Sequence, residues 1–157
     1  MNRPKARRDF ILDSGGLSHL ANSEARTIAW FEEIAQVWDA PAIFVPLVVM
    51  SECLTGNPRH DAKTHRLLKR IEAGAGDEGH WLHPTLASMS RASVLRTQAI
   101  KARANDNRPI SAIDAQVVAL AEERSAYRAV TILTTDAADI QLLVDLTRRP
   151  NLSVMAV

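Results

Sequence analysis

The chain has 157 residues, of which 46% are hydrophobic and 24% are charged, which excludes a disordered chain and is typical of one soluble globular domain. The formal net charge of +1 gives no overall sign of a nucleic-acid partner, although a net value can hide local clusters of charge. The longest apolar run, residues 40–50, contains two prolines and is too short to span a bilayer, and the lone cysteine, Cys53, cannot form an internal disulfide. We therefore expect a cytoplasmic protein with no membrane segment.

The first half of the chain alternates between short apolar runs and amphipathic segments. Residues 1–8 are basic, and we expect them to form a flexible extension of a single domain that spans residues 1–157. The segment Phe10-Ile-Leu-Asp13 predicts a strand that ends in a polar turn, Ser14-Gly15-Gly16. After this turn we predict a helix over 22–38, a strand over 42–45, a helix over 46–54, a helix over 61–73 and a short strand at 81–82.

The second half continues the same alternation. We predict a helix over 84–104, a loop over 105–109, a helix capped by Ser111, a strand over 129–133, a helix capped by Thr135 or Asp136, and a final strand over 152–157. Strands that alternate with helices indicate an α/β fold, here a three-layer α/β/α sandwich with a mainly parallel central sheet of about five strands. In such folds the functional side chains gather beyond the carboxyl ends of the strands.

Acidic residues fall at this edge of the predicted sheet. Asp13 ends the first strand, and Asp136 follows a later strand, with Asp139 three residues further on. Asp114 lies in the first turn of its helix, and Glu52 lies in the helix after the second strand. Carboxylates that are placed together repel one another unless a cation is present, and oxygen-rich sites suit Mg²⁺ or Mn²⁺. Such ions can activate water and stabilise the departing oxygen of a phosphodiester.

Each acid also has a purely structural interpretation. Asp114 follows Ser111 by three residues, as in a capping box, and Asp136 and Asp139 would favour a helix N-terminus electrostatically. Glu52 could point into solvent. Asp13 is the least natural cap, because it stands where an apolar strand meets a turn, and its position favours the functional interpretation.

A basic run follows in the second half of the chain. Five cations stand against the single acid Asp106, namely Arg91, Arg96, Lys101, Arg103 and Arg108. This run could face the phosphate backbone of RNA. It could equally form the solvated face of a helix, and both interpretations stay open.

The segments that carry the acids resemble the PIN-domain family. They are Phe10-Ile-Leu-Asp13-Ser-Gly-Gly-Leu17, Val45-Pro-Leu-Val-Val-Met-Ser-Glu52, Ile110-Ser-Ala-Ile-Asp114-Ala-Gln-Val-Val-Ala119 and Ile132-Leu-Thr-Thr-Asp136-Ala-Ala-Asp139-Ile140. The four pieces occur in the family's order, and the resemblance extends over nearly the whole chain. The first piece departs from the family at Gly15, where serine is more common, and His80-Trp-Leu-His83 has no counterpart that we can place.

This resemblance implies a Mg²⁺- or Mn²⁺-dependent endoribonuclease, which cleaves RNA with a metal-activated water and leaves 5′-phosphate and 3′-hydroxyl ends. By the same resemblance the metal ligands would be Asp13, Glu52, Asp114 and Asp136, with Asp139 as an outer ligand, and the supporting residues would be Ser14 and Thr135. Many single-domain members of this size resemble VapC-type toxins, which are often dimeric and are held silent by a small antitoxin. The resemblance therefore implies an RNA substrate, an antitoxin partner and a homodimer.

Two other functions remain open within the same fold. The chain could be a housekeeping nuclease that processes RNA, or a non-catalytic module that holds RNA or a protein. Loss of the acids would mark the second, and here all of them are present. A thiol mechanism through Cys53 is not favoured, because no partner histidine can be identified.

Overall fold

A five-stranded parallel sheet forms the centre of the molecule. The computed structural model describes residues 7–74, 80–103 and 108–157. The strands are β1 (Arg8–Leu12), β2 (Ala42–Pro46), β3 (Trp81–Leu82), β4 (Ala129–Thr134) and β5 (Leu152–Ala156). Their order across the sheet is β3-β2-β1-β4-β5, and every neighbouring pair is parallel. The predicted α/β fold with a mainly parallel sheet of about five strands is confirmed.

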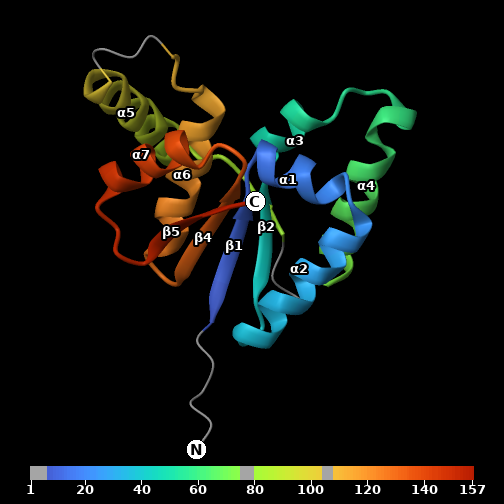
Figure 1. Ribbon diagram of the computed structural model, residues 1–157. Coiled ribbons are helices and arrows are strands. Elements are labelled where there is room, and N and C mark those ends of the chain that lie inside the picture. Colours follow the sequence, from blue (N-terminus) through green and yellow to red (C-terminus); the bar gives the residue numbers. More distant parts are fainter. Residues whose placement is uncertain (1–6, 75–79, 104–107) are drawn as a thin grey trace, which may run out of the picture.

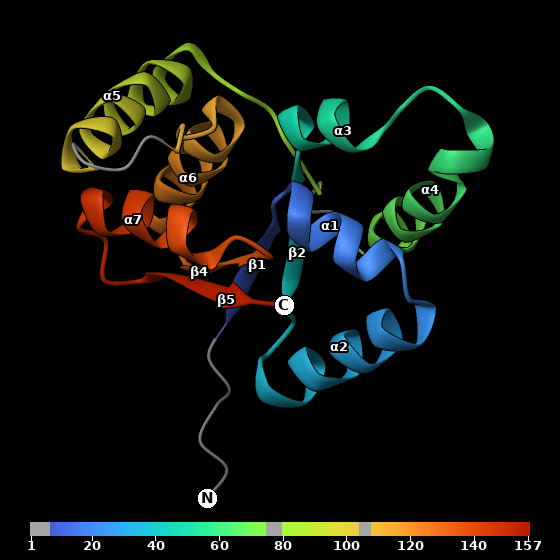
Figure 2. The ribbon, with the colours of Figure 1, turned by 45° about the horizontal axis from the view of Figure 1, so that its top comes forward.

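The helices cover the sheet from two sides. Within the described ranges they are α1 (Ser14–Ala21), α2 (Glu24–Val37), α3 (Leu47–Cys53), α4 (Pro58–Ala73), α5 (Leu86–Ala102), α6 (Ala112–Ser125) and α7 (Ala137–Thr147). Figures 1 and 2 show α5, α6 and α7 grouped on one side of the sheet and α1, α2 and α4 on the other. None of these helices is both long and apolar enough to cross a membrane.

The core lies around β1, the central strand. Phe10, Ile11 and Leu12 are fully buried, although consecutive side chains of a strand point to opposite faces. Phe10 meets the ring of Trp30 from α2 in an edge-to-face contact, with 5.5 Å between the ring centroids. Helices on both faces of a parallel sheet explain why the strand is a continuous apolar run rather than an alternating one.

One helix was not predicted. Residues Ser14–Ala21 form α1, where the sequence predicted a polar turn at Ser14-Gly15-Gly16. Two glycines at a helix start favour a turn interpretation, because glycine costs about 1 kcal/mol relative to alanine inside a helix. The helix forms because Asp13 caps it and because its buried residues Leu17 and Leu20 join the core.

The N-terminal boundary also differs from the prediction. Arg8, which we expected in a flexible extension, is the first residue of β1. Its guanidinium donates to Thr131 Oγ1 at 2.6 Å and to Ser153 Oγ at 3.0 Å, and it lies 4.4 Å from the centre of the Trp38 ring. These contacts fix Arg8 within the sheet. Residues 1–6 of the expected extension lie outside the described residues, as do residue 104 of the predicted helix and residues 105–107 of the expected loop.

Helix α4 begins earlier than the pattern suggested, at Pro58 rather than at Asp61. Asn57 caps it by accepting a hydrogen bond from the backbone of Arg59. Asp61 is buried in the first turn and accepts hydrogen bonds from Thr55 and Gly56, so it anchors the loop that leads into the helix. This loop connects α3, which carries Glu52, to α4.

Candidate active site

Asp13 stands at the carboxyl end of β1, beside the end of the neighbouring strand β4. Its backbone N–H donates to the carbonyl oxygen of Leu133 at 3.1 Å, and its carboxylate accepts from the backbone of Gly16 at 2.6 Å. The residue therefore caps α1, which the sequence made the less natural interpretation. Capping and a role in the site are compatible, because a carboxylate has several acceptor positions and the cap uses one of them.

Glycine at positions 15 and 16 follows from the close packing of α1 against β4. A Cβ atom on Gly16 would lie 2.9 Å from the carbonyl carbon of Leu133 and closer still to its oxygen. A Cβ atom on Gly15 would lie 3.1 Å from the backbone nitrogen of Thr135 and would overlap its side chain. A serine at position 15 would therefore require the Thr135 side chain to move, whereas glycine fits without a shift.

Glu52 reaches the site from α3, the helix that follows β2. The hydroxyl of Ser14 donates to Glu52 Oε2, which joins the first turn of α1 to α3. Ser14 was predicted to support the acids, and the acid that its hydroxyl contacts is Glu52. The adjacent Cys53 lies half-buried with its Sγ 3.6 Å from the carbonyl oxygen of Ser14. Burial raises the pKa of the Cys53 thiol, which keeps it protonated and makes it a poor nucleophile.

A threonine that the sequence analysis missed connects two of the acids. Thr134, the last residue of β4, is fully buried and accepts a hydrogen bond from the backbone N–H of Asp136 at 2.9 Å. Its hydroxyl also hydrogen-bonds to the Asp13 side chain. Thr135, to which the resemblance gave the supporting role, is exposed beside it. The sequence did contain a signal for Thr134. Side chains alternate between the two faces of a strand, so the inward side chain at the end of a strand lies close to the residues that follow it.

Asp136 is the N-cap residue that precedes α7, but its side chain makes no capping hydrogen bond. The capping interpretation therefore does not account for the carboxylate, which is exposed. Asp114 lies in the first turn of α6, where Ser111 accepts hydrogen bonds from the backbone of Ile113 and Asp114. Both carboxylates are thus held at helix starts that face the ends of β1 and β4.

The acids influence one another across the site. Burial, the largest cause, raises the pKa of Asp114 to about 7, and the negative charges of Asp13, Glu52, Asp136 and Asp139 add to the shift. The pKa of Asp13 is also raised, first by burial, against the opposing effect of its hydrogen bonds. Segments that are far apart in the sequence have therefore brought five carboxyl groups into one electrostatic environment.

Asp139 differs from the other acids because it already has a cation beside it. It forms an ion pair with Arg103 at the end of α5. The two side chains are 9% and 12% exposed, so the pair is largely shielded from water. Arg103 therefore neutralises part of the negative charge of Asp139, which sets Asp139 apart from the other acids.

The donor set fits a hard divalent cation by its chemistry. Carboxylate oxygens are the ligands that Mg²⁺ and Mn²⁺ prefer. However, no three acidic, histidine or cysteine side chains of the described residues stand close enough to hold one ion as they are arranged. The acids are close enough to raise the pKa of Asp114 but do not form a ready-made cage. Mutual repulsion between carboxylates is consistent with both observations.

The basic run does not form one free cationic face. Three of its arginines contact other parts of the chain: Arg91 binds Glu122, Arg96 binds the carbonyl oxygen of Ile110, and Arg103 binds Asp139. The first of these pairs is bidentate, with distances of 2.7 and 3.0 Å. These contacts tie α5 to α6 and α7. The other two cations of the run, Lys101 and Arg108, are exposed.

Comparison with solved structures identifies the fold. No protein-family model and no curated protein sequence matches the chain. Similar solved structures include VapBC-1 from nontypeable Haemophilus influenzae (TM-score 0.64, 14% identity, 94% of this chain and 97% of that chain). FitAcB from Neisseria gonorrhoeae gives a TM-score of 0.60 at 15% identity, with 93% and 96% covered. DNA-bound VapBC from Salmonella typhimurium gives 0.58 at 10% identity, with 98% of each chain covered. The chain has the PIN-domain fold of these structures.

Proposed function

We propose that this chain is a metal-dependent endoribonuclease and the toxin of a toxin–antitoxin pair. The observation that carries the proposal is the gathering of acids from β1, α3, α6 and the β4–α7 junction: burial, together with the charges of Asp13, Glu52, Asp136 and Asp139, raises the pKa of Asp114 to about 7. Carboxylates that raise one another's pKa cost stability when no cation is bound, and perturbed carboxyl groups of this kind cluster at functional sites. The shared fold with VapBC and FitAB proteins supports the same class of activity.

The chain's own residues have separate roles in this proposal. The ligands of Mg²⁺ or Mn²⁺ would be Asp13, Glu52, Asp114 and Asp136, with Asp139 as an outer ligand. When bound, the metal supplies a Lewis acid that activates water and stabilises negative charge on the leaving oxygen. Ser14 orients Glu52, and Thr134 holds Asp13 and the start of α7 in register. A pKa of about 7 leaves Asp114 partly protonated near neutral pH, and a bound cation would displace that proton.

The first test is a cleavage assay on single-stranded and structured RNA with Mg²⁺, Mn²⁺ or EDTA. We expect metal-dependent cutting that leaves 5′-phosphate ends and that falls by at least about 100-fold in Asp13→Asn, because a ligand is lost without a change in size. The matched control is Asp145→Asn, which neutralises an exposed aspartate of α7 that contacts Gln141. The control should cut like the wild type.

Two outcomes would contradict the nuclease. Cutting that survives Asp13→Asn would come from a contaminant or another site. Binding of RNA without cutting in any metal would instead favour the non-catalytic module of the same fold.

The toxin part of the proposal concerns partners. The similar structures carry the names VapBC and FitAB, and some contain DNA. We expect expression of the wild type to arrest bacterial growth, Asp13→Asn not to do so, and a small protein encoded beside this chain to relieve the arrest. Light scattering on the purified chain tests the proposed homodimer. Growth that is unaffected by an RNA-cutting wild type would favour a housekeeping nuclease.

A further inference from the structure

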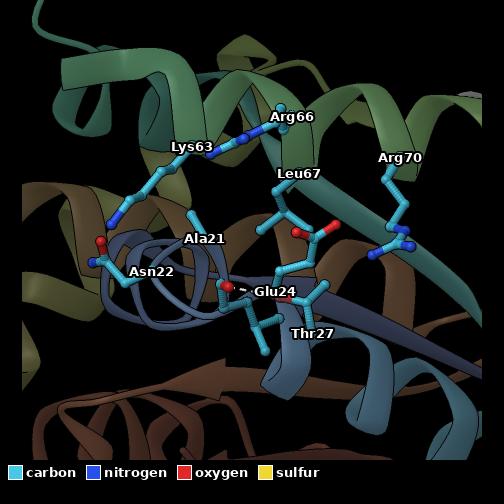
Figure 3. Close-up of a pocket in the computed structure, with 9 residues that line it drawn as sticks. Ala21, Asn22, Glu24, Thr27, Lys63, Arg66, Leu67 and Arg70 are labelled. Atoms are coloured by element: carbon cyan, nitrogen blue, oxygen red, sulfur yellow. Dashed lines mark hydrogen bonds between the residues drawn. The ribbon is translucent and has the colours of Figure 1, made fainter. Parts of the chain in front are cut away.

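A cavity lies away from the acids, between the end of α1, the start of α2 and the side of α4. Its volume is about 420 Å³. Its lining includes two apolar residues, Leu20 and Leu67, and both belong to the buried core. Figure 3 shows Lys63, Arg66 and Arg70 extending from α4 along its upper edge.

The cavity is cationic. Lys63, Arg66 and Arg70 are spaced three and four residues apart, which places them on one face of α4. Glu24 is the one acid among the residues that line the cavity, so the lining carries a net charge of +2 (three cations minus one anion). All four side chains belong to exposed residues. Like charges on one helix face repel, so this arrangement does not stabilise α4 by itself.

These cations also differ from several other arginines of the chain. Arg91, Arg103 and Arg124 are each engaged by a carboxylate of another element. Within residues 7–74, 80–103 and 108–157, none of the three cavity cations has a carboxylate within 4.0 Å. Their charge is therefore available to an anion from outside.

Helix α1 connects this cavity to the acids. Asp13 caps its first turn, whereas Leu20 and Ala21 of its last turn line the cavity. Eight helical residues span roughly 12 Å. An anion in the cavity is therefore separate from the group held at the acids, yet close enough to belong to the same extended molecule.

We propose that the cavity binds a backbone phosphate of the RNA substrate, a short distance along the strand from the phosphodiester at the acids. This inference rests on the proposed nuclease function and assigns part of its substrate path. Arginine matches phosphate oxygens with a planar fork of donors, and lysine adds a mobile point charge. A cationic contact beside an acidic site also offsets the repulsion that the acids exert on RNA.

The test compares two pairs of substitutions on the same helix. Lys63→Ala/Arg66→Ala removes two cavity cations, and Arg59→Ala/Lys69→Ala removes two exposed cations of α4 that do not line the cavity. Binding of a labelled single-stranded RNA is measured by fluorescence anisotropy in EDTA over a range of salt concentrations. Arg70→Ala is measured separately, and thermal melts verify that each variant is folded.

We expect the cavity pair to weaken binding at least about fivefold at low salt and to reduce the slope of log K against log[salt] by about 0.7 for each phosphate that the protein no longer neutralises. The control pair should stay within about twofold of the wild type, and Arg70→Ala should fall between the two. Equal reductions in affinity in both pairs would overturn the proposal, because the cations would then act only through the general field of the helix. Unchanged binding in the cavity pair would overturn it as well.

The same measurements separate this proposal from the nuclease itself. RNA binding through the cavity without any cutting would overturn the nuclease and retain the cavity's role in binding. If cutting depends on Asp13 but the cavity pair changes neither the RNA affinity nor its salt slope, the nuclease is retained and the role of the cavity is overturned. A polyglutamate peptide is measured in the same way. If the cavity pair loses binding of this peptide but not of RNA, the cavity belongs to an acidic protein and the proposal is overturned.

Discussion

Single hydroxyl groups organise the acids of the site. Ser14 donates to Glu52, and Thr134 contacts both the Asp13 side chain and the backbone of Asp136. The buried hydroxyl of Thr134 accepts from the backbone N–H of Asp136 and also fixes the direction of the Asp13 carboxylate. Because catalytic geometry tolerates only small displacements, such positioning residues matter although they need not touch the substrate.

We predict that Thr134→Val lowers kcat by about 10–100-fold, because it removes the hydroxyl that holds two acids in register while it preserves the shape of the side chain. The backbone donor of Asp136 then loses its acceptor, so we also expect a loss of about 1–2 kcal/mol in stability. The measurement is kcat and KM on RNA beside a denaturant melt.

Thr135→Val is the matched control for this prediction, because Thr135 is the exposed neighbour. It should leave kcat nearly unchanged. A larger effect at Thr135 than at Thr134 would support the role that the resemblance implies for Thr135 and would contradict the positioning role of the Thr134 hydroxyl.

At the scale of elements, the junction between α1 and β4 sets the position of Asp13. The first turn of α1 lies so close to the end of β4 that glycine is the residue that fits at position 16. The same junction holds the backbone N–H of Asp13 against the carbonyl oxygen of Leu133. Local packing and the site therefore depend on the same few atoms.

We predict that Gly16→Ala destabilises the protein by about 1–3 kcal/mol, because the added carbon overlaps the backbone of β4, which has little room to shift. Gly74→Ala is the control: its added carbon would lie 3.5 Å from the carbonyl oxygen of Arg70, an ordinary contact. Urea unfolding monitored by circular dichroism measures both. A Gly16→Ala variant as stable as the control would mean that α1 moves freely relative to β4.

At the scale of the whole molecule, the acids cost stability when no cation is bound. Asp114 has a pKa of about 7 in the folded chain, whereas an unfolded aspartate titrates near about 3.9. Between these values the folded state binds more protons than the unfolded state. By linkage, this carboxyl therefore lowers the stability of the metal-free protein as the pH rises from about 4 to 7.

We predict that Asp114→Asn raises the Tm of the EDTA-treated protein by roughly 3–6 °C at pH 8 and has little effect at pH 4, because the amide cannot ionise. Addition of Mg²⁺ or Mn²⁺ should raise the Tm of the wild type at pH 8 and raise that of the variant less. Differential scanning fluorimetry across pH measures both effects, with Asp145→Asn as the control. A wild type that gains stability between pH 4 and 7 through Asp114 would contradict the raised pKa.

The class of fold and the edge of the sheet at which the acids lie could both be predicted from the sequence. Alternating strand and helix patterns require a parallel sheet covered on both faces, and the carboxyl ends of parallel strands meet at one edge. Asp13 and Asp136 were therefore expected at the same edge of the sheet, although it is the pairing of β1 with β4 that makes them neighbours. That expectation depends only on chain direction and periodicity, which a single sequence carries.

The neighbours that each side chain contacts could not be predicted, because they depend on how the elements pack. The Asp13–Leu133 and Arg103–Asp139 contacts join segments that are distant in the sequence, and the first turn of helix α1 packs its glycines against the end of β4. The choice of Thr134 over Thr135 depends on which of two adjacent side chains points inward. Such choices follow from how elements pack at contact distance, and local patterns do not specify that geometry because the same sequence pattern fits several packings.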